Sequence, residues 1–101
     1  MAHGIPTTEA HLAALVTAAG RFAAHARDAG LDASVPTCPG WVVLDLVAHQ
    51  GMVHRWATAV VRGYDPRTVD DTALETQGRD EPDPVAWLER GAADLVRALE
   101  D

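Results

Sequence analysis

The sequence predicts an all-α protein, a bundle of three long helices with a long connection between the second and the third. Apolar residues recur at intervals of three and four along three stretches, and this is the period of an amphipathic helix. No stretch alternates apolar and polar residues as a half-buried strand does. The three stretches run from about residue 8 to 29, from about 42 to 62 and from about 84 to 101.

The first helix is expected to begin at Thr7 or Thr8, whose hydroxyl can cap the free backbone amides. Gly30 is expected to end it. His11 and His25 fall away from its apolar face, and we expect both to be solvated. The apolar face consists of Leu12, Leu15, Val16, Ala19, Phe22, Ala23 and Ala26.

The second helix follows a turn at Cys38-Pro39-Gly40 and is expected to run to about Arg62, where Gly63 stops it. Its start is irregular, because Val42 stands where Ser or Thr would cap best. Asp45 is therefore expected to meet the positive end of the helix dipole.

A histidine lies within the apolar stripe of this second helix. The stripe consists of Leu46, His49, Val53, Trp56 and Val60. We therefore expect His49 to face the interior groove of the bundle. A buried imidazole needs partners for both nitrogens, which hydrogen bonds or a metal ion can supply. From the residues alone, a hydrogen-bonded core histidine is the favoured interpretation.

Other residues of this region have a functional and a plain interpretation. His54 cannot chelate a metal together with His49, because five residues leave the two side chains about 140° apart, and it is expected to flank the site or support a ligand. Cys38 is either a reactive thiol or, as we prefer, a small apolar residue that fills the turn. Trp41 and Trp56 would line a ligand pocket or, more commonly, the core, and Arg55 would bind an anion or, more commonly, lie on the surface.

The connection from Tyr64 to Asp83 is rich in acidic residues and is interpreted as a solvated crossover. It is long enough to run back along a helix, so the third helix need not be antiparallel to the second. Asp83-Pro84 is a good helix start, a cap followed by Pro in the first turn. The apolar face of the third helix consists of Val85, Leu88, Ala92, Leu95, Val96 and Leu99.

The composition excludes several classes of function. The net charge of −7 argues against non-specific nucleic-acid binding. No apolar run is long enough to span a bilayer, and the first residues do not resemble a signal peptide. The single cysteine cannot form an internal disulfide, so we expect a reducing, cytoplasmic setting.

Three segments together resemble a known family. Val35–Trp41, Asp45–His49 and Val53–Trp56 look like the N-terminal domain of mycothiol-dependent maleylpyruvate isomerases, which belong to the DinB-like superfamily. The resemblance implies a four-helix bundle with a long crossover and a bound divalent metal, usually zinc. It makes His49 a metal ligand, with two further ligands from a Glu-x-x-x-His pair on a fourth helix. We expect residues 1–101 to form a single domain that is truncated before that helix.

The resemblance also implies a chemistry. Zinc holds a coordinated thiol as the thiolate at neutral pH. In the isomerase, the mycothiol thiolate would add to the cis double bond of maleylpyruvate, and rotation and elimination would give fumarylpyruvate. The implied partners are a small-molecule substrate and a low-molecular-weight thiol.

Activity is left open, because two of the three ligands are missing from the sequence. One alternative is a non-catalytic helical module that has lost the metal. Another is a helix-pairing protein that forms a homodimer through an open helical groove.

Overall fold

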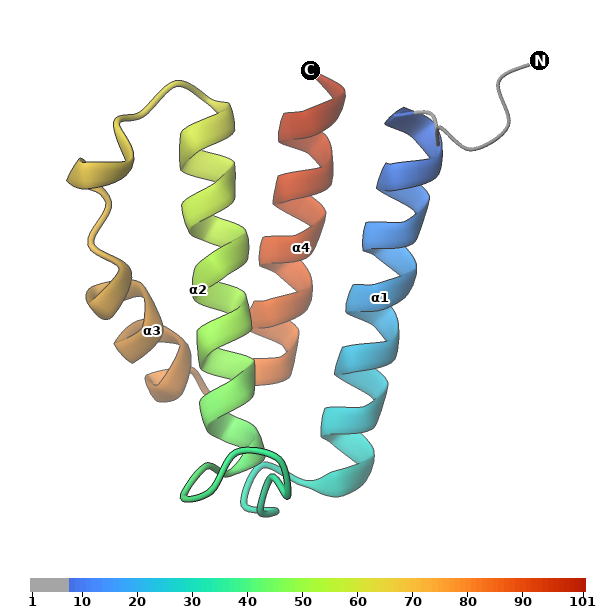
Figure 1. Ribbon diagram of the computed structural model, residues 1–101, viewed down its shortest axis with the longest axis vertical. Helices are drawn as coiled ribbons and strands as arrows, with labels where there is room; N and C mark the ends of the chain where they lie inside the picture. Colours follow the sequence, from blue (N-terminus) through green and yellow to red (C-terminus); the bar gives the residue numbers. More distant parts are fainter. Residues whose placement is uncertain (1–7) are drawn as a thin grey trace.

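The computed structural model describes residues 8–101, and within them the regular structure is helical apart from one isolated bridge between Ser34 and Val42. Three long helices stand side by side, and a short one lies across the outer face of the second (Figure 1). The predicted all-α bundle is confirmed. The elements are α1 (Thr8–Ala29), α2 (Val43–Val61), the 3-10 turn η1 (Pro66–Thr68), α3 (Asp71–Asp80) and α4 (Pro84–Glu100).

The helix boundaries follow the local signals in the sequence. α1 begins at Thr8, whereas Thr7 lies outside the described residues. Gly30 and Gly63, which follow α1 and α2, have φ of 89° and 97°, so each stands where a side chain would be strained. The Asp83 carboxylate accepts a hydrogen bond of 3.0 Å from the amide of Ala86 and caps α4 as expected.

α4 is the helix on which the others assemble. It packs against both α1 and α2, while α1 and α2 hardly touch each other. The main apolar cluster lies where the three helices converge, with Phe22, Leu31 and Val43 packed against it from the side. Its members are Ala23, Ala26, Val47, Val85 and Leu88. The α1–α2 side of the bundle is consequently left open.

The connection from Tyr64 to Asp83 is mostly exposed, as expected, but it is more ordered than the sequence indicated. This segment contains α3, which packs along α2. The Asp70 carboxylate caps α3 by accepting a 3.0 Å hydrogen bond from the amide of Ala73. Gly78 of α3 is buried. Little in the sequence indicated this contact, because the buried residue of α3 is a glycine and not an apolar side chain.

The indole of Trp87 fills the space between α2, α3 and α4. Trp87 is 1% exposed. A Cβ at Gly51 or at Gly78 would come within 2.6 Å of carbon atoms of its ring, so only glycine fits at either position. The Arg55 guanidinium carbon lies 3.9 Å from the ring centroid, and Arg55 Nη2 donates a 2.9 Å hydrogen bond to the Trp87 carbonyl. Arg55 is thus partly buried, and the expectation of a surface arginine is wrong. The contact combines a cation–π interaction with a charge-assisted hydrogen bond.

The prediction of which side of α2 faces inward is also wrong. Trp56, a member of the predicted apolar stripe, is 38% exposed, and Trp41, also expected in the core, is 37% exposed. Gly51 of α2 lies against the Trp87 indole of α4, where a larger residue would clash, so the side of α2 that carries Gly51 is the buried one. The buried residues of α2 are Val47, Ala48, Gly51, Met52 and His54. Within residues 8–101, no helix is both long enough and apolar enough to cross a membrane.

Candidate functional site

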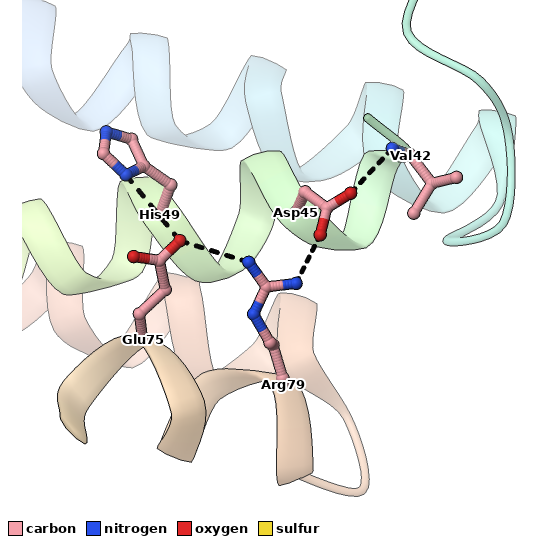
Figure 2. A network of polar contacts seen from close by, with 5 residues as sticks. All are labelled: Val42, Asp45, His49, Glu75 and Arg79. Carbon is pink, nitrogen blue, oxygen red and sulfur yellow. Dashed lines mark hydrogen bonds and ion pairs between the residues drawn. The ribbon is translucent and has the colours of Figure 1, made fainter. Parts of the chain in front are cut away.

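His49 lies on α2 at the side that faces α3, with a side chain that is 48% exposed. The expectation that it faces the interior of the bundle is therefore wrong. Its Nδ1 atom lies 3.8 Å from Oε1 of Glu75 in α3, and the other ring nitrogen points away from that carboxylate (Figure 2). The indole of Trp41 approaches the imidazole in an edge-to-face arrangement, with 6.0 Å between ring centroids.

Arg79 holds Glu75 in place. Its Nη2 lies 3.3 Å from the same Glu75 oxygen, one turn earlier in α3. Its Nη1 contacts Oδ1 of Asp45, and Oδ2 of Asp45 accepts a 2.8 Å hydrogen bond from the amide of Val42 (Figure 2). This chain of contacts ties α3 to the first turn of α2 beside His49.

Asp45 and Arg79 each stabilise the charged form of the other. The side-chain hydrogen bond from Arg79, and then the one from the Val42 amide, lower the pKa of the Asp45 carboxyl. The Asp45 hydrogen bond in turn raises the pKa of Arg79. The carboxylate side chains of Asp45 and Glu75 are only 22% and 23% exposed, which reduces screening by water. The expected role of Asp45 at the helix start is confirmed, and its link to Arg79 is an addition.

The residues described here fit one ligand position of a metal and not a complete site. His49 offers one imidazole nitrogen that faces away from its carboxylate neighbour. Within residues 8–101, three or more His, Cys, Asp or Glu side chains do not gather as a metal site would require. A zinc ion bound at His49 would need its other donors from outside these residues.

His54 is not a flank of this site. It is 4% exposed and belongs to the interior, where its Nε2 lies 3.0 Å from the Gln50 side-chain nitrogen. Within residues 8–101, no hydrogen-bond partner reaches its Nδ1. Burial, and then the charge of Arg55, lower the pKa of His54, so the ring is neutral near pH 7. The prediction of a supporting role beside His49 is wrong because α2 is rotated from the expected orientation.

The remaining candidates behave as their plain interpretations predict. Cys38 is a free, partly buried thiol in the turn, and its amide donates a 3.1 Å hydrogen bond to the carbonyl of Val35. His11 and His25 are exposed. The residue that the sequence did not reveal is Glu75, since the segment that carries it had been interpreted as a solvated connection.

Comparison with known protein families finds a match over most of the chain. A family profile described as the mycothiol maleylpyruvate isomerase N-terminal domain matches residues 12–101, which include His49 and Glu75. No curated protein and no solved structure matches the chain.

Proposed function

We propose that this chain, which belongs to the mycothiol maleylpyruvate isomerase N-terminal domain family, provides His49 as one ligand of a zinc ion in a thiol-dependent enzyme. The family name supports a link to mycothiol and to isomerase-type chemistry. The substrate class we propose is a small molecule that reacts with a low-molecular-weight thiol. A reducing, cytoplasmic setting fits this proposal, because the thiol must stay reduced.

The observation that carries the proposal is the pairing of His49 with Glu75. Histidines that bind metals commonly direct one ring nitrogen to a carboxylate and the other to the metal. Here Nδ1 lies on the side of Glu75, and the other nitrogen points away from α3 (Figure 2). The side chain is half exposed, so a ligand or metal can reach it.

The chemistry supplied by a bound zinc is to hold the thiol of mycothiol as the nucleophilic thiolate at neutral pH. The residues of this chain would hold His49 in position for the metal. Glu75 of α3 lies beside its imidazole, and Arg79 keeps the Glu75 carboxylate in place. Because one histidine alone binds zinc weakly, we expect low zinc affinity unless further donors complete the site.

A zinc titration followed by NMR of the histidine rings tests the proposal. We expect the His49 imidazole signals to shift first as zinc is added, and the effect to vanish in His49→Ala. His11→Ala removes an exposed histidine from α1 and serves as the matched control. The proposal fails when zinc leaves the His49 signals unmoved, or when His11→Ala abolishes binding as fully as His49→Ala does.

The open side of the bundle favours a second candidate function, the pairing of two copies. α1 and α2 hardly touch, and Phe22, Val43 and Leu46 line an apolar hollow between them. Exposed apolar surface of this kind is often covered by a partner. Light scattering coupled to size exclusion tests this candidate. A dimer that Leu46→Arg converts to a monomer supports it, and a wild-type monomer at about 100 μM contradicts it.

A further inference from the structure

We propose that Glu75 is a positioning residue for His49. It holds the imidazole proton on Nδ1, so that Nε2 carries the lone pair and is the nitrogen that binds a metal. The metal half of this inference rests on the proposed function, whereas the proton position is a property of the metal-free chain.

The geometry places the carboxylate beside the correct nitrogen. Glu75 Oε1 lies 3.8 Å from His49 Nδ1, which is longer than a hydrogen bond but leaves no room for another side chain between the two atoms. A distance about 1 Å shorter would be a hydrogen bond of ordinary length. α2 and α3 are packed together, so the fold keeps the two side chains close to each other.

The electrostatics then select the tautomer. A neutral imidazole has one N–H donor and one acceptor nitrogen, and an ionised carboxylate can only accept. With the proton on Nδ1, the donor faces Glu75. With the proton on Nε2, two lone pairs would face each other across the contact. The arrangement with the proton on Nδ1 is therefore favoured, and it leaves the lone pair on Nε2.

Arg79 prevents Glu75 from turning away. It lies 3.3 Å from the oxygen that faces His49 and also contacts Asp45, so it is anchored at both ends. Trp41 approaches the imidazole at an interplanar angle of 76° and restricts rotation of the ring. The carboxylate and the ring are therefore both restrained, which is what a positioning contact requires.

The proton position can be measured directly in the metal-free protein. Long-range proton–nitrogen NMR spectra of the histidine rings, recorded at a pH where His49 is neutral, distinguish the two tautomers. We expect mainly the Nδ1–H form in the wild type and a shift toward the Nε2–H form in Glu75→Ala. Asp80→Ala removes an acidic side chain from the same helix and should leave the His49 tautomer unchanged. Glu75→Gln keeps the shape of the side chain and should shift the tautomer in the same direction as Glu75→Ala. A wild type that is mainly Nε2–H, or a tautomer that neither Glu75 variant changes, overturns the inference.

Zinc affinity separates this inference from the proposed function. When His49 binds zinc in the wild type, we expect Glu75→Ala to weaken binding about 10- to 100-fold relative to Asp80→Ala, the usual effect of removing such a partner. Equal affinity in the two variants overturns the positioning role and leaves the proposed function standing. Failure of zinc to reach His49 in any variant removes the proposed function, and the tautomer measurement still decides the role of Glu75.

Discussion

Replacement of Gly51 by alanine tests the packing that places α3 beside His49. The added Cβ would lie 2.6 Å from Cε3 of Trp87 and closer still to Cζ3, and real Cβ atoms do not approach other atoms this closely. The indole has little room to shift, because Trp87 is buried and a Cβ at Gly78 would also lie 2.6 Å from its Cη2 atom. Gly51→Ala must therefore displace Trp87, α3 or both.

The size of the effect follows from two opposing contributions. Alanine gains about 1 kcal/mol over glycine in a helix interior. Overpacking in a close-packed core typically costs about 1–3 kcal/mol. Because the ring is crowded by two helices, we expect a cost at the upper end of that range and a net loss of up to about 2 kcal/mol in the free energy of unfolding.

Urea denaturation with linear extrapolation measures this loss. Gly20→Ala in α1 is the matched control, because nothing lies within 4 Å of its added Cβ, and it should stabilise the protein by about 0.5–1 kcal/mol. In Gly51→Ala/Trp87→Leu the smaller side chain should relieve the clash, so the two effects should not add. A Gly51→Ala protein as stable as Gly20→Ala would refute the reasoning.

Three further predictions concern the same framework. Arg55→Lys should lower the free energy of unfolding by about 1–3 kcal/mol, because the Trp87 carbonyl loses its guanidinium donor. Arg62→Lys, at an exposed ion pair, should change the free energy of unfolding little, and thermal unfolding of the two variants makes the comparison. Asp83→Ala should cost about 1 kcal/mol in urea denaturation because α4 loses its cap, and an unchanged midpoint would contradict that role. His54 has a lowered pKa in the folded state, so the unfolded chain binds more protons below its ordinary value of 6.5. The stability that neutral His54 contributes is complete above pH 6.5 and is lost as the pH falls toward the folded-state pKa. Over that range the free energy of unfolding should fall by up to about 1.4 kcal/mol per pH unit. His54→Gln should flatten this slope just below pH 6.5, and an equally steep slope in the variant would exclude His54 as its source.

The sequence predicted the parts of the fold that depend on local signals. Gly30 and Gly63 stand at positive φ where two helices stop, and Asp83 caps the last helix. Each of these residues acts within one turn of its own position, so the chain reveals its role without the tertiary structure.

The parts that the sequence did not predict depend on contacts between helices. Gly51 and Gly78 carry no hydrophobic signal, yet their bare backbone lets the Trp87 ring lie between α2 and α3. The position of that ring decides which side of α2 is buried, and so leaves His49 half exposed. Glu75 was missed for the same reason, since nothing local indicates that its acidic segment packs against α2.

The location of bound zinc tests the central claim most directly. Crystals of the protein grown with zinc, and measured at the zinc absorption edge, would show each zinc ion as an anomalous density peak. We predict a peak about 2.0–2.1 Å from Nε2 of His49, with Glu75 hydrogen-bonded to Nδ1. Zinc bound at other residues while His49 stays without it, or zinc bound through Nδ1 with Glu75 turned away, would contradict the assignment.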